Sequence, residues 1–206
     1  MKIALSGASG FVGWHTQVAA HTRSDLEIVP LGRAAFENPA LMRAALSESD
    51  AVIHLAGVNR AATEDEIRET NTWLATQLAA GISQNDRPIP LVYGNSIHSA
   101  GHTVFGAAKQ HAGEILSAAC RSNSSPFVDV ILPNLFGEHG RPFYNSFVST
   151  FCHQLASGEK PAIDVDRELP LLHVQRAVAV LLDLTHSPGN RRIELSAPIT
   201  SVGDVL

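Results

Sequence analysis

A glycine-rich segment near the N-terminus, Ser6-Gly7-Ala8-Ser9-Gly10-Phe11-Val12-Gly13, constrains the fold of this chain more than any other feature. It follows an apolar stretch with the character of a strand and opens a stretch with helical periodicity. In such a unit Gly7 permits a tight turn, Gly10 lets the backbone approach a phosphate, and Gly13 allows close helix packing. The helix N-terminus then offers free N–H groups to an anion. The segment therefore predicts a phosphate-binding loop, although the same glycines without this context would indicate only a turn.

The remainder of the chain alternates short apolar stretches with helical ones. Strands are predicted over residues 2–6, 26–31, 51–55, 90–93, 127–132 and 193–195, and helices over residues 11–23, 39–46, 64–81, 104–121, 146–156 and 174–185. Such alternation is typical of a parallel sheet with helices on both faces. Together with the glycine-rich loop it predicts an α/β fold, a Rossmann-type doubly wound parallel sheet that binds a dinucleotide.

Composition narrows the functional classes. The formal net charge is −5 and no block of Lys and Arg occurs, so binding to nucleic acid or to an anionic membrane is not indicated. No stretch has the length of a transmembrane span or the pattern of a signal peptide, and the two cysteines make no disulfide framework. The histidine spacings do not favour a metal site. These observations predict a cytoplasmic protein of one domain, residues 1–206.

Residues after the second and third strands bear on the dinucleotide. NAD enzymes usually carry an acid after the second strand, but here Gly32-Arg33 stands there, and Arg33 can pair with a 2′-phosphate. NADP(H) is therefore favoured over NAD(H), with a solvated surface Arg33 as the alternative. The third strand ends in the small residues that let a cofactor pass. The predicted cofactor contacts are Gly7, Ser9, Gly10, Phe11, Val12, Gly13, Arg33, Leu55, Ala56 and Gly57.

Several motifs together carry a family resemblance. They are Ser6-Gly7-x-x-Gly10-Phe11-x-Gly13, residues 50–57 (DAVIHLAG), Asn71, Ser96, Lys109 and residues 133–137 (PNLFG). With them the chain resembles the extended short-chain dehydrogenase/reductase superfamily, whose NAD-dependent epimerases, dehydratases and reductases act on nucleotide-sugars in polysaccharide biosynthesis. Residues 54–60 (HLAGVNR) and 141–152 (RPFYNSFVSTFC) further resemble the reductase domain of bifunctional capsular-polysaccharide enzymes that make UDP-N-acetyl-L-fucosamine. That group reduces a 4-keto sugar nucleotide with NADPH.

The resemblance implies roles for individual residues. Ser96 would hydrogen-bond the reacting sugar oxygen, Lys109 would bind the nicotinamide ribose, and Pro133 would lie beside the nicotinamide. The implied substrate contacts are Ser96, Asn134, Arg141, Tyr144 and Asn145. The resemblance also implies a homodimer, and a substrate-binding part formed by about residues 134–206. A helix cap expected at Ser201 leaves only five residues after it, which indicates an incomplete substrate-binding part, by shortening or by natural truncation.

One position departs from the family's chemistry. The family pattern Tyr-x-x-x-Lys reads Phe105-Gly106-Ala107-Ala108-Lys109 here, and phenylalanine has no hydroxyl to donate a proton. Other departures are Gly94-Asn95 before Ser96, Leu132 before Pro133, and residues 173–176 (HVQR) in place of an Asp-Asp stretch. Tyr144, His98 or His102 could replace the missing hydroxyl, with ordinary substrate-contact and loop roles as the alternatives.

Two hypotheses follow. In the first, the chain is an NAD(P)-dependent oxidoreductase or epimerase acting on a keto-sugar nucleotide, with a substitute proton donor or slow turnover through proximity alone. In the second, it is a catalytically impaired dinucleotide-binding protein of the same fold. Phe105, which stands where the family pattern has tyrosine, motivates both hypotheses.

Overall fold

The computed structural model describes residues 1–206 and is built on one central parallel sheet. Its strands are β1 (Lys2–Ser6), β2 (Glu27–Leu31), β3 (Ala51–His54), β4 (Leu91–Ser96), β5 (Phe127–Leu132) and β8 (Arg191–Glu194). They are arranged in the order β2-β1-β3-β4-β5-β8, and every pair in the sheet is parallel. This confirms the predicted α/β doubly wound fold. From β1 the chain first adds β2 on one side and then continues with β3 on the other side. The position between β1 and β3 is therefore the switch point at which open α/β sheets bind ligands.

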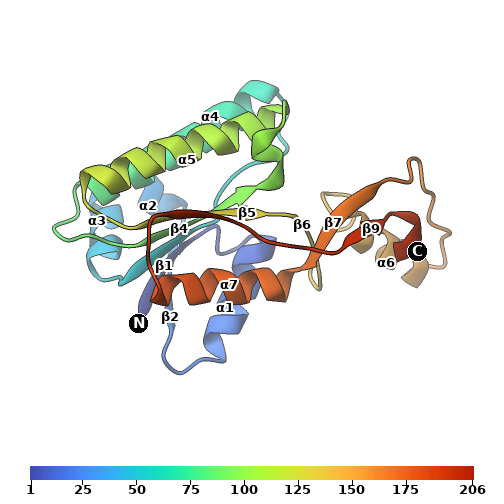
Figure 1. Ribbon diagram of the computed structural model, residues 1–206, viewed down its shortest axis with the longest axis horizontal. Coiled ribbons are helices and arrows are strands. Elements are labelled where there is room, and N and C mark those ends of the chain that lie inside the picture. The colour runs from blue at the N-terminus through green and yellow to red at the C-terminus, as the bar shows by residue number, and fades with distance from the viewer.

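Helices cover both faces of this sheet (Figure 1). On one face lie α4 (Glu64–Ser83) and α5 (Val104–Ser122), and on the other lie α1 (Phe11–His21) and α7 (Val174–His186). The short α2 (Arg33–Glu37) and α3 (Pro39–Ser47) follow the edge strand β2. One apolar core fills each side of the sheet, with Leu78, Tyr93 and Leu116 in the first and Leu5, Val130 and Leu181 in the second. Both cores exclude water, so the sheet is a rigid base for the loops at its strand ends.

A small lobe extends from one end of the sheet (Figure 1). It contains β6 (Asn134–Phe136), α6 (Phe147–Ala156), β7 (Glu168–His173), β9 (Ile199–Ser201) and the 3₁₀ turn η2 (Gly203–Val205). β7 is the centre of this three-stranded sheet, parallel to β6 and antiparallel to β9. Its own core is small: Phe151, Leu169, Leu171 and Val202. The lobe therefore has an apolar core of its own, separate from the two cores of the central sheet.

The structure refines the predicted division of the chain. Residues 134–206 do not form one unit, because α7 and β8 return to the central sheet between β7 and β9. The helix expected after Ser201 is a 3₁₀ turn, and Ser201 ends β9 while its hydroxyl accepts a hydrogen bond from the Asp204 N–H. α2 was not predicted, since its five residues are too few to show a helical period.

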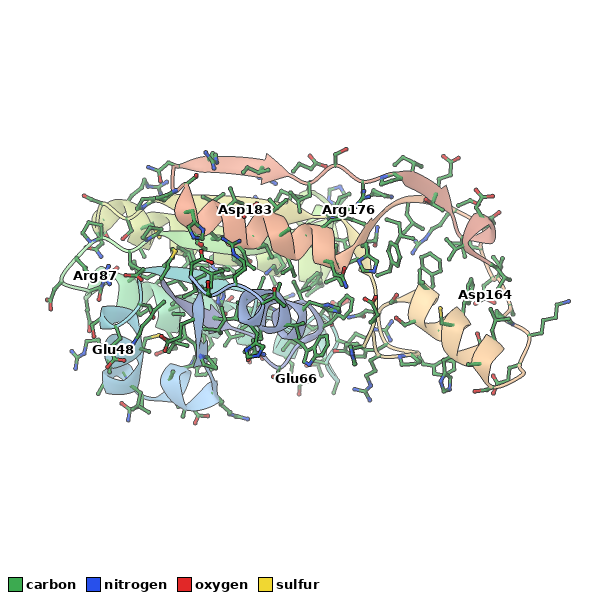
Figure 2. All side chains as sticks on the ribbon, turned by 90° about the horizontal axis from the view of Figure 1, so that it is seen from below. Glu48, Glu66, Arg87, Asp164, Arg176 and Asp183 are labelled. Carbon is green, nitrogen blue, oxygen red and sulfur yellow. The ribbon has the colours of Figure 1, made fainter.

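Charged side chains are distributed over the outside of both parts (Figure 2). Arg176 and Asp183 lie along α7, and Asp164 lies in the loop between α6 and β7. Each of these three is exposed. No helix is both long enough and apolar enough to cross a membrane.

Candidate functional site

A cavity of about 1010 Å³ lies at the carboxyl ends of the central strands, between the sheet and the loop that leads into α6. It brings together segments that are distant in the sequence. Of the residues singled out from the sequence, it is lined by Gly7, Ser9, Gly10, Phe11, Val12, Gly13, Leu55, Gly57, Ser96, Phe105, Lys109, Pro133, Asn134, Arg141, Tyr144 and Asn145. Concave sites at the switch point of an α/β sheet are the usual ligand sites of such folds.

The glycine-rich loop forms one wall, and its geometry explains the glycines. Gly7 has φ +72°, and a Cβ there would lie 2.7 Å from the Ala56 nitrogen. A Cβ on Gly13 would lie 2.0 Å from the Gly7 carbonyl oxygen, so α1 packs directly on the loop. Gly10 is the N-cap residue of α1 and has no side chain to satisfy the first N–H groups of the helix. Those groups remain available to an anion in the cavity.

A buried hydroxyl fixes this loop to the neighbouring strand. Ser6 Oγ accepts hydrogen bonds from the Leu55 and Ala56 N–H groups at 3.1 and 3.2 Å, and it lies 2.6 Å from His54 Nδ1. Burial, with a further contribution from the charge of Lys109, lowers the pKa of His54 to about 3, so this imidazole stays neutral. His54 is thus a buried structural residue that holds Ser6. The role of Ser6 was not foreseen, because a serine at a strand end has many ordinary uses.

Ser96 stands at the end of β4, where its backbone is held by Asn95. The Asn95 side chain accepts a hydrogen bond from the Ser96 N–H at 2.8 Å and donates one to Asp129 at 2.9 Å. Asp129 in turn lies 3.7 Å from Arg192. The Ser96 hydroxyl accepts a hydrogen bond from the His98 N–H at 3.2 Å and caps the 3₁₀ helix η1 (Ile97–Ala100). Asn95, noted only as a departure from the family pattern, therefore positions Ser96.

Lys109 lies at the floor of the cavity, with only 5% of its surface exposed. Its ammonium donates to the Gly94 carbonyl oxygen at 2.7 Å and lies 4.2 Å from the centre of the Tyr93 ring. Burial lowers the pKa of Lys109 to about 7, although the Asp129 carboxylate partly opposes this shift. A buried lysine without a paired carboxylate is unusual, which makes Lys109 a candidate functional residue.

Phe105 also lines the cavity, one helical turn before Lys109 on α5. Its ring places no polar atom where the family pattern expects a hydroxyl. Of the residues considered as replacements, Tyr144 and His98 line the cavity and His102 does not. The start of α5 is fixed in place, because a Cβ on Gly106 would lie 1.9 Å from the His98 carbonyl oxygen.

The loop between β6 and α6 closes the cavity mouth and reaches the loop after β3. The Tyr144 hydroxyl donates to Asn59 Oδ1 at 3.3 Å. The guanidinium carbons of Arg60 and Arg141 lie 5.5 and 5.3 Å from the centre of the same Tyr144 ring, as cation–π contacts. Neither arginine has a carboxylate within 4.0 Å, unlike Arg33, which pairs with Glu37. The two cations are therefore available to an anionic ligand.

Other residues of the site were not predicted. Trp14 and His139 also line the cavity, and their ring centroids lie 4.0 Å apart. Trp14 follows the last glycine of the loop directly, which is the signal that could have found it. Two predicted cofactor contacts lie outside the cavity lining. Ala56 contributes its N–H to Ser6, and Arg33 is the exposed first residue of α2, bonded to Glu37 at 2.7 Å.

The charge of the cavity differs from that of the whole chain. The chain carries 20 acidic residues and a net charge of −5. None of these acids lines the cavity, whereas Lys109 and Arg141 do. Together with the positive end of α1, these cations give the cavity a positive potential. The fold and the site define a nucleotide-binding α/β protein whose cavity suits an anionic ligand.

Comparison with known proteins places the chain within that class. Residues 3–191 match the NAD dependent epimerase/dehydratase family, and the chain belongs to it. A UDP-2-acetamido-2,6-beta-L-arabino-hexul-4-ose reductase from Pseudomonas aeruginosa is 36% identical over 157 residues, which are 75% of this chain and 41% of that protein. The chain thus spans less than half the length of this curated relative.

Solved structures agree on the fold. The capsular polysaccharide assembling protein CapF from Staphylococcus aureus superposes with a TM-score of 0.80 at 23% identity, over 100% of this chain and 55% of that one. UDP-glucose 4-epimerase from Thermotoga maritima, solved with UDP-glucose, superposes with a TM-score of 0.84 at 16% identity, over 100% and 80%. The resemblance inferred from the sequence motifs is confirmed at the level of family and fold.

Proposed function

We propose that this chain binds a nicotinamide dinucleotide and a keto-sugar nucleotide in the cavity and acts as a reductase or epimerase on the sugar. The observation that carries the proposal is one cavity that joins the glycine-rich loop to Ser96 and Lys109 and contains no carboxylate. The family and the nucleotide-sugar named in the curated relative support the same class of ligand.

The glycine-rich loop fits the dinucleotide. A Cβ on Gly7 or on Gly13 would collide with neighbouring backbone, so both glycines permit the close packing of the loop that leaves the first N–H groups of α1 available to the cavity. When bound, the dinucleotide supplies or accepts a hydride at its nicotinamide. Lys109, at the floor of the cavity, can hold the hydroxyls of the attached ribose, and Ser96 can hydrogen-bond the sugar oxygen at the reacting carbon. Leu55 and Pro133 add apolar surface to the lining of the same cavity.

NADP(H) preference is the first prediction, and it tests the proposal directly. Arg33 can exchange its bond with Glu37 for a 2′-phosphate, so we expect NADPH to bind about tenfold more tightly than NADH, the value of one charge-assisted hydrogen-bonding contact. The emission of Trp14, which lines the cavity, should report binding. Replacing Arg33 with Ala should remove the preference without reducing NADH affinity. If neither dinucleotide binds, the proposed function is wrong.

The Arg60 and Arg141 side chains support a second anion site, in addition to the glycine-rich loop. Both contact the Tyr144 ring at the cavity mouth, and neither has a protein carboxylate to pair with. A diphosphate joining a nucleoside to a sugar carries the charge that two such guanidinium groups recognise. The site thus supports a nucleotide-sugar as the second ligand.

This gives a prediction for substrate binding. Replacing Arg60 or Arg141 with Gln should weaken UDP binding about tenfold, because each removes a charge-assisted contact. Uridine, which lacks the phosphates, should lose no affinity. Arg43→Gln is the matched control, since Arg43 is exposed on α3 and distant from the cavity lining. Isothermal titration calorimetry measures all four proteins, and equal losses for UDP and uridine would contradict the assignment.

The alternative, a dinucleotide-binding protein without turnover, is favoured by one observation, the Phe105 ring in place of a phenol. It predicts binding of NADPH with no consumption of it on any keto-sugar nucleotide. Turnover of a UDP-linked 4-keto sugar above the rate without protein decides between the two.

A further inference from the structure

We propose that Lys109 is the proton donor of this protein, taking the place that a tyrosine would hold at position 105. The inference rests on the proposed function, because it needs hydride transfer to a sugar carbonyl. It concerns the same cavity but assigns a chemical step to a residue that would otherwise only bind the cofactor.

The surroundings of the Lys109 ammonium lack a fixed ion-pair partner. From β4, the ammonium meets the Gly94 carbonyl oxygen at 2.7 Å and the face of the Tyr93 ring. From the loop after β3, a Cβ on Gly57 would lie 4.0 Å from Lys109 Nζ and 2.8 Å from Asn71 Oδ1 of α4, so a neutral amide lies on that side. No carboxylate oxygen lies within 4.0 Å of Lys109 Nζ.

None of the charged or titratable groups on the neighbouring strands forms an ion pair with the Lys109 ammonium, and on the adjoining η1 the titratable side chain that lines the cavity is His98. His54 of β3 is held neutral by burial, which lowers its pKa to about 3. Burial raises the pKa of the Tyr93 hydroxyl, which donates to the Lys109 carbonyl oxygen. Asp129 of β5 is held by Asn95 and attracts the ammonium from a distance. A lysine in such a setting releases its proton far more easily than one in water.

Geometry brings this ammonium to the reacting end of the cavity. Lys109 and Phe105 are four residues apart on α5, so their side chains lie on the same helix face, and both line the cavity with Ser96. Gly94, whose carbonyl Lys109 contacts, precedes Ser96 by two residues on the same strand. A sugar oxygen held by Ser96 therefore lies at the side of the cavity from which Lys109 can reach it, directly or through the Ser96 hydroxyl.

The proton balance is simple in the direction of reduction. A bound reduced nicotinamide would supply the hydride that forms the C–H bond at the carbonyl carbon, and the C=O π pair would move to oxygen. That oxygen takes a proton from the Lys109 ammonium and becomes the hydroxyl of the product. Lys109 is left as a neutral amine, which burial favours, and regains its proton from water before the next turnover. Oxidation runs through the same steps in reverse, with the amine as base.

The sign of the pH dependence follows. Reduction needs the ammonium, so the rate should be high below the pKa of Lys109, about 7, and fall tenfold per pH unit above it. Oxidation needs the amine and should fall below the same pH. Replacing Lys109 with Arg keeps a cation that can contact Gly94 and the ribose but cannot release a proton. We expect this variant to bind NADPH within about threefold and to lose turnover by the 10²–10⁴-fold typical of a missing general acid.

The test combines a direct titration with kinetics. The chain has three lysines, Lys2, Lys109 and Lys160, so protein labelled with ¹³C at lysine gives few signals, assigned through Lys2→Met and Lys160→Met. The Lys109 signal is titrated in the protein alone and with NADPH bound. The pH dependence of kcat/KM for a UDP-linked 4-keto sugar at saturating NADPH is then compared with that titration.

Three outcomes are distinguishable. A break in kcat/KM that coincides with the Lys109 titration in the NADPH complex, together with the loss of turnover in Lys109→Arg, supports the proposal. Turnover with a break that differs from the Lys109 titration, or that disappears in His98→Asn, overturns it and leaves the proposed function standing. NADPH binding without turnover on the keto sugar overturns the reductase function and the donor role together.

Discussion

Replacing Gly13 with Ala should abolish useful dinucleotide binding, with a loss of at least about 100-fold in affinity. A Cβ at position 13 would lie 2.0 Å from the Gly7 carbonyl oxygen and 2.8 Å from the Ala8 Cα. Both contacts are with backbone that has no rotamer to yield. Helix α1 must therefore move away from the loop, and its N–H groups move away from the phosphates. Overpacking of this kind also costs stability, about 3 kcal/mol.

A matched control separates the local effect from a general cost of Gly→Ala substitution. Gly189, between α7 and β8, has only the flexible end of Arg191 near its added Cβ, at 3.7 Å. Gly189→Ala should leave NADPH affinity unchanged and alter stability by less than about 0.5 kcal/mol. Urea unfolding and fluorescence titration measure both variants. An unchanged NADPH affinity in Gly13→Ala would show that the dinucleotide does not lie on this loop.

The glycine-rich loop also shows why so much of the fold could be predicted. The backbone geometry at Gly7 and Gly13 requires glycine, so a single residue type in the sequence is enough to indicate it. The alternation of apolar and helical stretches fixes the parallel sheet in the same local way, because each period is visible within one element. Strands β6, β7 and β9 escaped prediction for the opposite reason. They are short, and they depend on pairing between distant segments: Asn134 pairs with Leu171, 37 residues away, and Glu168 pairs with Ser201, 33 residues away.

The candidate site could likewise be predicted only where local sequence determines it. Its positions were found where a motif names them, as for Ser96, Lys109 and Tyr144. Its interactions were not, since the burial of Lys109 depends on Tyr93, Gly94 and the packing of α5 against β4. The pairing of Arg60 with Tyr144 likewise joins two loops that are distant in sequence. Contacts of this kind depend on tertiary structure, and they leave no periodic pattern in the sequence.

Replacing Phe105 with Tyr should increase turnover at least about tenfold. The ring already lines the same cavity as Ser96 and Lys109, so we expect an added hydroxyl to face the cavity rather than the core. A positioned proton donor contributes 10²–10⁴-fold, and Lys109 supplies part of that in the native chain. NADPH affinity should change by less than about threefold, because the hydroxyl adds no contact that the native ring lacks with the phosphates. The measurement is consumption of NADPH with a UDP-linked 4-keto sugar.

The double variant Phe105→Tyr, Lys109→Arg then separates the two roles open to Lys109. If Lys109 donates the proton in the native chain, the single Lys109→Arg variant lacks a donor, and the new phenol should restore its turnover at least tenfold. If Lys109 only binds the ribose, the same defect persists whichever residue stands at position 105. Because Phe105→Tyr alone already raises turnover, the deciding quantity is the cost of Lys109→Arg in each background. A cost that is large in the native chain and small in the Phe105→Tyr background shows that the loss was the loss of a transferable proton. If the double variant binds NADPH but does not recover turnover, another group of the cavity is the proton donor, and His98 is the next residue to replace.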